Sequence, residues 1–589
     1  MNQRTLFFVK MTNKMTASRR TVSVCLFLWI ATLTVFAQSK ADKMDALMRQ
    51  YVENRQFNGS VLVAENGKVI FKKGYGMANM EWDIPNAPDT KFRLGSITKQ
   101  FTSMLVMQLA EKGKIKLNDK ITTYLPDYPK ATGDKVTIHH LLTHTSGIPS
   151  YTNFPKFFEN LSRDPFTPQV FVKQFCDLPL EFEPGSAFAY NNSGYFLLGV
   201  IIEKVTGKPY AQVLQEQILT PLQMNNTGYD LHEPILAKRA SGYEKRGAKY
   251  VNAAYLDMTI PYAAGSMYST VEDLYLWDQA LYTDKLISAS SKATLFTPFL
   301  SNYAYGWGVE KMKMGELKDS LQVIEHSGGI NGFNTILTRI PKDKQLVVLL
   351  NNTGGAPLGA IRKNLLNILY NQPVTPPKKS VADAFRQTLL SSSLEKAVQQ
   401  FQTLKTDKAY LLNENEMNAL GYELLGEGKK KEALAVFDLN VQAFPNSFNV
   451  YDSRGEAYMA IGDKAASIKD YKKSLELNPR NTGGIEKLKE LGEKAEAPKD
   501  VVVPGSVLET YAGDYQLAPN FILTVTKEGD KLITQATGQQ KIEIFAESET
   551  KFYPKVMQAT IEFVKDETGK VTKLILNQGG RTIEAKKIK

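Results

Sequence analysis

The sequence predicts a chain of three parts that differ in architecture: a mixed α+β part, then an all-helical part, then a small all-β part. Two β-hairpin patterns frame the first part and enclose helical patterns, a 34-residue period marks the second, and short strand patterns fill the third. Proline-containing breaks at 373–379 and 495–500 separate the three. A length of 589 residues agrees with about three domains.

Residues 1–37 have the composition of a secretory signal peptide. The first 20 residues include five basic residues and no acidic one, and an apolar run follows from Val22 to Ala37. This run is shorter than the about 20 residues that span a membrane, so we favour a cleaved signal over a retained anchor. Because the basic segment is long, translation could begin at Met11 or Met15. Cys25 lies inside the apolar run, which argues against a lipoprotein cleavage site.

Charge and cysteine content restrict the partners and the compartment. Loss of five of the 72 basic residues with the signal leaves 67 against 61 acidic residues, so the net charge falls from +11 to +6. The basic residues form no concentrated stripe, and we expect no nucleic-acid partner. The mature chain keeps only Cys176 and cannot form an intramolecular disulfide. We expect export across the inner membrane, to a bacterial periplasm, without a membrane span after cleavage.

Hairpin patterns lie at both ends of the α+β part, which we place at 38–372. The first surrounds Asn66-Gly67, a pair typical of tight hairpin turns, and the second covers 335–350. A helical pattern at 360–369 follows. These features predict one antiparallel sheet built from both ends of the region, with a helical insertion between them.

Ser96 and Lys99 are the candidate nucleophile and its activating base. They lie in Arg93-Leu-Gly-Ser-Ile-Thr-Lys99, a glycine turn that leads into the apolar run 104–109. Residues three apart share a helix face, and an amine beside a serine hydroxyl can accept its proton. The helix N-terminus adds unpaired N–H groups where an oxyanion would form. The same Ser-x-x-Lys pattern also begins at Ser393 and Ser548, where we expect the side chains to lie on the solvated surface.

Tyr190 and Asn192 form the second candidate pair. They follow a Pro-Gly turn and precede an apolar helical run, unlike the Tyr-x-Asn copies that begin at Tyr151 and Tyr250. A lysine ammonium would favour the phenolate of Tyr190, which could then act as base for the nucleophile and as acid for the leaving group. Asn192 would orient the lysine and a substrate amide. The alternative is a core tyrosine with a helix-capping asparagine.

His326, Gly328 and Gly329 form the third candidate group, where a strand pattern runs into glycines, and we expect them to bind and orient the substrate. Glycines let a substrate backbone approach closely, and the N–H groups of Gly329 and the nucleophile could form an oxyanion hole. A second histidine group at 139, 140 and 144 has no acidic or cysteine partner at ligand spacing, so we expect a structural role and no metal site.

These three motifs, in this order, resemble those of the class C β-lactamase and penicillin-binding-protein family of serine hydrolases. The segments His-Leu-Leu-Thr-His-Thr-Ser-Gly, Phe-x-Pro-Gly and Ala264–Asp273 add to the resemblance, which extends from about Asp42 to Tyr370. The resemblance implies the β-lactamase/transpeptidase-like α+β sandwich. It also implies an acyl-enzyme on the serine, and catalysis without a metal or other cofactor.

One departure from that family concerns the third motif. Class C β-lactamases and most penicillin-binding proteins have Lys-Thr/Ser-Gly where this chain has His326-Ser-Gly. The lysine binds the substrate carboxylate, and a histidine carries only a fractional charge near neutral pH. His-x-Gly is similar to the esterase and D-amino-acid amidase or peptidase branches, so we expect no dedicated β-lactamase.

The helical part, placed at 380–494, resembles tetratricopeptide repeats because four residue pairs lie 34 apart: Gly421 and Gly455, Gly428 and Gly462, Phe437 and Tyr471, Pro445 and Pro479. Such arrays bind peptides or partner domains, or they act only as spacers. Residues 380–411 should supply another helix pair. The tail, placed at 505–589, is similar to a small β domain often appended to this family.

The sequence therefore predicts a secreted serine hydrolase that acts on ester or amide bonds, including D-amino-acid peptides. Two alternatives remain open: a non-catalytic peptide-binding or sensory scaffold, and a true β-lactamase. The intact set of serine, lysine, tyrosine and asparagine argues against the first, and the histidine of the third motif argues against the second.

Overall fold

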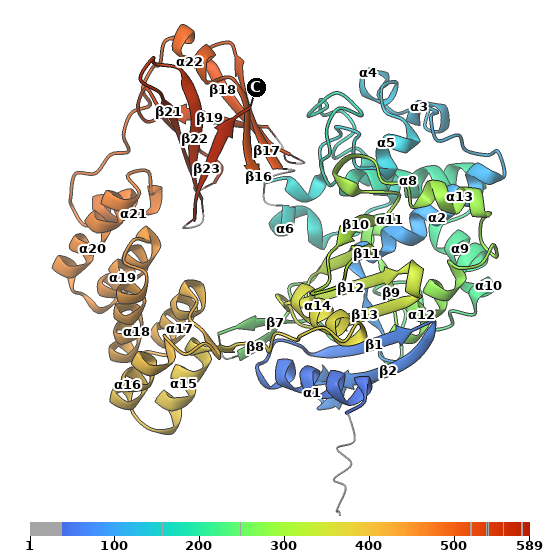
Figure 1. Ribbon diagram of the computed structural model, residues 1–589, viewed down its shortest axis with the longest axis horizontal. Helices are drawn as coiled ribbons and strands as arrows, with labels where there is room; N and C mark the ends of the chain where they lie inside the picture. The colour runs from blue at the N-terminus through green and yellow to red at the C-terminus, as the bar shows by residue number, and fades with distance from the viewer. Residues whose placement is uncertain are drawn as a thin grey trace, which may run out of the picture. The chain divides into compact units, whose positions relative to one another are not determined.

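The fold of the chain was obtained as a computed structural model (Figure 1). The predicted signal peptide, residues 1–37, lies outside the residues that the structure describes. Those residues are 38–155, 157–247, 249–518, 521–537, 539, 541–557, 559–578 and 581–588.

An antiparallel sheet forms the base of the α+β part, in the strand order β10-β11-β12-β13-β1-β2. Both predicted hairpins are confirmed. The Asn66-Gly67 turn between β1 and β2 has positive φ at both residues, as its sequence requires. Strands from the start and the end of the region meet where β1 pairs with β13. The strands are β1 (Gly59–Glu65), β2 (Lys68–Tyr75), β10 (Gly308–Met312), β11 (Leu321–Ile330), β12 (Phe333–Ile340) and β13 (Gln345–Asn351).

Helices cover both faces of this sheet. On one face α1 and α14 pack on each other and on the strands, around a core that includes Val61 and Leu349. The other face carries the helical insertion, whose larger core includes Phe101 and Trp277. The layered α+β sandwich is thus confirmed (Figure 1). Helices of this part include α1 (Lys40–Glu53), α2 (Thr98–Glu111), α5 (Ile138–Leu142), α8 (Asn192–Thr206), α11 (Tyr262–Gly265), α12 (Val271–Ala280), α13 (Ala289–Leu295) and α14 (Leu358–Leu369).

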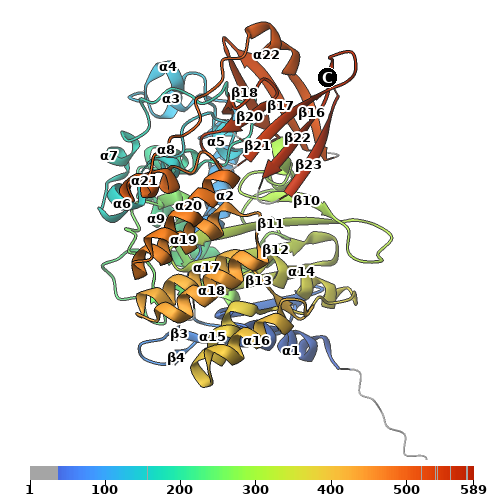
Figure 2. The same ribbon diagram turned by 90° about the vertical axis from the view of Figure 1, so that its left-hand side faces the viewer.

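The helical part consists of consecutive antiparallel helices (Figure 2). Its 34-residue period has a packing cause. A Cβ on Gly421 would lie 2.6 Å from the ring of Phe437, and one on Gly455 would lie 3.4 Å from that of Tyr471. Glycine in the first helix thus admits an aromatic ring from the second. The helices are α15 (Val381–Ser391), α16 (Leu394–Leu404), α17 (Glu414–Gly426), α18 (Lys430–Ala443), α19 (Phe448–Ile461), α20 (Lys464–Leu477) and α21 (Thr482–Glu490).

The tail forms a closed antiparallel barrel in which β16 pairs with β23. Strand patterns at 521–526, 531–534, 542–545, 559–564 and 571–576 are confirmed, whereas β16, β20, β23 and the short helix α22 were not foreseen. The elements are α22 (Gly505–Tyr511), β16 (Gly513–Ala518), β17 (Phe521–Glu528), β18 (Lys531–Ala536), β19 (Ile542–Ala546), β20 (Lys551–Pro554), β21 (Ala559–Lys565), β22 (Val571–Gln578) and β23 (Arg581–Lys587).

Across the described ranges, no helix has both the length and the apolar character needed to cross a membrane.

Candidate active site

Ser96 lies in a tight turn between the edge strand β5 (Phe92–Arg93) and helix α2. A 3₁₀ turn, Gly95–Ile97, precedes the helix, so Ser96 and Lys99 lie almost directly above one another. Gly95 has a φ of 56°, and a Cβ on it would lie 2.9 Å from the nitrogen of Gly329. Only glycine fits this backbone conformation at so close a contact. The turn therefore fixes the serine against strand β11.

Lys99 has three polar neighbours and is completely buried. Its Nζ lies 3.0 Å from Ser96 Oγ, 2.8 Å from Asn192 Oδ1 and 2.9 Å from the carbonyl oxygen of Ala264. Burial lowers the Lys99 pKa well below its usual value. A neutral amine has two protons, which the two carbonyl oxygens accept, so its lone pair is left for the serine hydroxyl. The geometry is that of a general base beside a nucleophile.

The start of helix α8 explains why Asn192 is available to the lysine. Asn191, not Asn192, caps the helix, because its Oδ1 accepts the N–H of Gly194 at 2.7 Å. Asn192 then directs Oδ1 to Lys99 and donates from Nδ2 to Thr152 Oγ1 at 3.1 Å. The two asparagines thus divide capping and lysine contact between them.

Tyr190 differs from the expectation about its protonation. Its ring centroid lies 4.8 Å from Lys99 Nζ, and its hydroxyl interacts with Ser96. We expected the lysine to favour the phenolate. Instead, withdrawal from water raises the Tyr190 pKa, and the buried lysine supplies no fixed positive charge. About 39% of the residue remains exposed, while its hydroxyl interacts with the buried nucleophile turn at Ser96. Tyr190 is suited to donate a proton.

His326 lies on β11 and is buried, with both ring nitrogens occupied. Nε2 lies 2.8 Å from the Tyr303 hydroxyl, and Nδ1 lies 2.6 Å from the Ser327 carbonyl oxygen. Burial and the nearby Lys99 lower the His326 pKa to about 3. The sequence suggested a fractional charge and a substrate contact. The ring is instead neutral, and neither nitrogen is free for a substrate.

Gly328 and Gly329 lie against the serine turn, but their surroundings differ. A Cβ on Gly328 would lie 1.9 Å from the Leu94 carbonyl oxygen, whereas one on Gly329 would meet only Asn334 Nδ2, at 4.0 Å. The Leu94 carbonyl also accepts the Thr335 hydroxyl at 2.7 Å. Gly328 thus permits the close approach of the turn, and Gly329 borders open space beside Ser96.

We expect Gly328→Ala to destabilise the protein by about 1–3 kcal/mol, as overpacked sites do, because the Leu94 backbone has to move. Ester hydrolysis should fall with it, since Leu94 leads into the serine turn. Gly329→Ala is the matched control and should leave the unfolding free energy within about 1 kcal/mol. Urea unfolding of both variants measures the difference. Equal destabilisation of the two would contradict the predicted role of Gly328.

A cavity of about 300 Å³ opens beside Ser96. Within the described part of the chain, none of the residues that line it is charged. Besides Ser96 and Asn192, its wall is mainly apolar and includes Tyr151, Leu256, Ile260, Pro261 and Ile330. Such a wall favours an uncharged, largely apolar substrate group.

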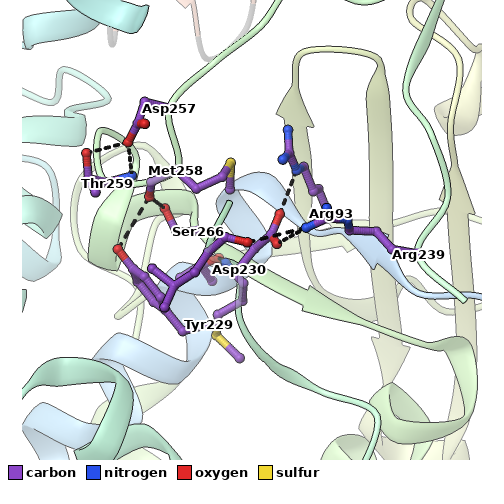
Figure 3. A network of polar contacts seen from close by, with 11 residues as sticks. Arg93, Tyr229, Asp230, Arg239, Asp257, Met258, Thr259 and Ser266 are labelled. Atoms are coloured by element: carbon purple, nitrogen blue, oxygen red, sulfur yellow. Dashed lines mark hydrogen bonds and ion pairs between the residues drawn. The ribbon is translucent and has the colours of Figure 1, made fainter. Parts of the chain in front are cut away.

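A buried ion pair anchors the strand that leads to the serine turn (Figure 3). Asp230 is almost fully buried and accepts from Arg93 Nε at 2.7 Å and from Arg239 Nη1 at 2.8 Å. Arg93 ends β5, three residues before Ser96. Charge-assisted bonds of this kind restrict the position of that strand.

A second set of polar contacts shapes the cavity wall (Figure 3). The Met258 carbonyl oxygen accepts the hydroxyl groups of Ser266 and Tyr229, and Asp257 accepts the backbone N–H of Thr259 at 2.9 Å. These bonds hold the segment 256–265, part of which lines the cavity and which provides the Ala264 carbonyl. The resemblance included Ala264–Asp273 but assigned no role to the Ala264 carbonyl.

The histidines in and directly after α5 make structural contacts near the serine site. His144 is buried, its Nδ1 accepts the Asn191 N–H at 3.0 Å, and its ring centroid lies 4.3 Å from that of Tyr190. His140 closes a capping box with Thr137 at the start of α5. In the described residues no set of three or more His, Cys, Asp or Glu side chains could hold a metal ion. Tyr303, which contacts His326, had no signal in the sequence.

Comparison with known proteins assigns the chain to a family. The profile described as "Beta-lactamase" matches residues 44–371. The chain belongs to the Beta-lactamase family. A tetratricopeptide repeat profile matches residues 448–481, and a "Domain of unknown function (DUF3471)" matches residues 497–587. The resemblance drawn from the three motifs is confirmed.

The proteins to which this chain is similar have several different names. Penicillin-binding protein 4* of Bacillus subtilis is 31% identical over 462 residues, which cover 73% of this chain and 96% of that protein. Teichoic acid D-alanine hydrolase of Staphylococcus aureus is 31% identical over 311 residues, 52% of this chain and 73% of that one. D-amino acid amidase of Ochrobactrum anthropi SV3 shares the fold, with a TM-score of 0.50 and 24% identity over 56% of this chain and 99% of its own.

Proposed function

We propose that this protein is a secreted serine hydrolase that forms an acyl-enzyme on Ser96 and cleaves ester or amide bonds, including bonds in D-amino-acid compounds. One observation carries the proposal. The amine of Lys99 lies 3.0 Å from Ser96 Oγ while two carbonyl oxygens take its protons. Burial of a lysine lowers the stability of the folded protein, and a buried lysine beside a serine hydroxyl is typical of a catalytic base.

The first half-reaction is acylation. Lys99 Nζ takes the proton of the Ser96 hydroxyl as Oγ attacks the substrate carbonyl carbon. The N–H groups of Ser96 and Gly329 stabilise the oxyanion that forms. As the tetrahedral intermediate collapses, the Tyr190 hydroxyl protonates the leaving alcohol or amine, and the proton held by Lys99 returns to the tyrosine.

The second half-reaction releases the acyl group. Water enters where the leaving group was, gives one proton to the base, and adds its oxygen to the acyl carbon. When the bond to Ser96 Oγ breaks, Oγ takes back the proton that the base received from water, so the carboxylic acid leaves and the serine hydroxyl is restored. Asn192 holds the lysine in place through both steps.

The surroundings of Ser96 favour substrates that are uncharged next to the scissile bond. The cavity wall is uncharged, and His326 is neutral. Penicillins and D-Ala-D-Ala peptides both bear a carboxylate near the bond that is cleaved, so we expect them to react more slowly than a neutral ester. The name of the 31% identical teichoic acid D-alanine hydrolase supports a D-alanyl ester or amide as one substrate class.

Intact-mass analysis after exposure to a short-chain nitrophenyl ester, a D-Ala-D-Ala peptide and a penicillin tests this function. We expect an adduct or turnover that is fastest with the ester and absent in Ser96→Ala. Ser393→Ala is the matched control, because this serine belongs to the other Ser-x-x-Lys spacing and only caps helix α16. It should react as the wild type does.

Two outcomes would replace the proposal. Fast Ser96-dependent turnover of the penicillin alone would indicate a β-lactamase. No adduct and no turnover with any of the three compounds would favour a non-catalytic scaffold.

Export and partner binding complete the proposal. We propose that residues 1–37 direct secretion to the periplasm, in keeping with their basic and apolar segments. The helical repeats would bind a peptide or a protein partner there. Pull-down with the secreted chain and with a chain cut before residue 380 would test the second point.

A further inference from the structure

The tautomer of His326 follows from its two hydrogen bonds. Nδ1 lies 2.6 Å from the Ser327 carbonyl oxygen, which can only accept, so Nδ1 carries a proton. A neutral imidazole then has its lone pair on Nε2. The Tyr303 hydroxyl, 2.8 Å away, must donate to it. Protonation of Nε2 would require the loss of this bond.

Tyr303 contacts both the histidine and the proposed proton donor. It follows α13 and a 3₁₀ turn, and it is only 7% exposed. Its ring is nearly perpendicular to those of Tyr190 and His326, with centroids 6.3 Å and 5.7 Å away. The side chain is therefore held by packing as well as by its hydroxyl group.

The groups that face His326 from other elements do not favour a second charge. Any proton held by the Lys99 amine on α2 would oppose protonation of the ring, and a charge on His326 would in turn disfavour a charge on His144, after α5. Tyr190 and Tyr303 have pKa values raised by burial and stay neutral. Each of these contacts preserves a neutral ring.

The place occupied by His326 is the one at which the resembling enzymes have a lysine that binds the substrate carboxylate. A neutral ring at this place gives no countercharge, and its two nitrogens are already bonded within the protein. A substrate carboxylate would lose hydration here without gaining an ion pair, which is costly.

We propose that Tyr303 is a positioning residue that holds His326 as the uncharged Nδ1–H tautomer, and that the site thereby selects substrates without a carboxylate beside the scissile bond. This inference rests on the proposed hydrolase function and defines its substrate class. Tyr303 acts through His326 and does not touch the reacting atoms.

The test compares two peptides that differ only in one charge: a D-Ala-D-Ala peptide with a free C-terminal carboxylate and the same peptide with a C-terminal amide. The wild type should prefer the amide. Tyr303→Phe keeps the ring but removes the donor, and the ratio of kcat/KM for amide over carboxylate should fall about tenfold at pH 6, the effect of one charge-assisted hydrogen bond.

Tyr305→Phe is the matched control. Tyr305 is about as buried, lies two residues further on, and its hydroxyl is hydrogen-bonded to His139 Nδ1 at 2.8 Å, outside the serine site. It should leave the substrate ratio unchanged. The nitrophenyl ester serves as the reference for activity in each variant, so a general loss of catalysis is separated from a change of selectivity.

Nitrogen NMR of the histidine rings gives a readout that does not depend on activity. The chain has five histidines, and the ring signal that disappears in His326→Gln is the one of His326. In the wild type the ring should remain the Nδ1–H tautomer from pH 5 to 8. In Tyr303→Phe it should sample the Nε2–H or protonated form in this range.

Failure of this inference differs from failure of the proposed function. A protonated or Nε2–H ring in the wild type would overturn the inference even if the enzyme is active, as would an unchanged substrate ratio in Tyr303→Phe. Absence of any acyl-enzyme with all substrates would instead overturn the hydrolase function. The wild-type spectrum decides the tautomer even if the variant does not fold.

Discussion

Lys99→Met should lower kcat/KM for ester hydrolysis by about 10²–10⁴-fold, the contribution of a general base, because Ser96 then has no acceptor for its proton. The structure places the amine 3.0 Å from the serine oxygen. Lys112→Met is the control at the end of the same helix. Its amine is exposed, bonds to Gln217 at 3.0 Å, and lies far along α2 from the serine. An active Lys99→Met variant would contradict the role of the lysine as base.

The same substitution should change how stability depends on pH. Burial lowers the Lys99 pKa well below its usual 10.5, so between the lowered pKa and 10.5 the unfolded chain binds more protons than the folded one. Linkage makes the wild-type unfolding free energy rise with pH in this window, by up to about 1.4 kcal/mol per pH unit. Lys99→Met lacks this contribution. Urea unfolding at pH 7 and pH 9 should therefore favour the wild type more at pH 9, and a pH-independent difference would refute the buried neutral lysine.

Arg339→Met should destabilise the α+β part by about 3–5 kcal/mol, because it leaves the buried Asp278 carboxylate without its partner. The pair joins strand β12 to helix α12, with Nε 2.8 Å from Oδ1 and both side chains at most 2% exposed. Burial already raises the Asp278 pKa, and loss of the arginine would raise it further. Thermal and urea unfolding measure the effect.

Two comparisons separate this explanation from a simple packing defect. The double variant Arg339→Met/Asp278→Leu should recover most of the lost stability, since it removes the buried charge together with its partner. Lys72→Met breaks the exposed pair with Glu272 on the same helix and should cost no more than about 1 kcal/mol. A double variant no more stable than Arg339→Met would contradict the charge argument.

Much of the fold could be predicted because its signals are local. The Asn66-Gly67 turn has positive φ at both residues, and Asn-Gly is a residue pair that tolerates this conformation, so the sequence predicts the turn. The repeat period was visible because glycine and an aromatic ring recur wherever two helices touch, as at Gly421 and Phe437. The strands β16, β20 and β23 were missed because they are short or polar, and closure of the barrel satisfies their backbone groups.

The sequence predicted those residues of the candidate site that belong to short motifs. Ser96, Lys99, Tyr190 and Asn192 were named from spacing, and the structure brings them together. The spacing did not reveal that the Ala264 carbonyl accepts from the lysine, or that Tyr303 bonds to His326. Ala264 lies more than 160 residues from Lys99, at the start of a segment that entered the resemblance without a role for its carbonyl. Tyr303 lies 23 residues from His326, in a segment without a motif.

The sequence by itself determined the order of the motifs, the two hairpins, the repeat period and the family, because each depends on residue types at fixed short spacing. Only the tertiary structure decided the direction of the pKa shifts: burial lowers the pKa values of Lys99 and His326 and raises that of Tyr190. The physical reason is desolvation. The pKa of a side chain depends on how deeply it is buried and on which dipoles surround it, and both are set by segments that meet only when the chain has folded.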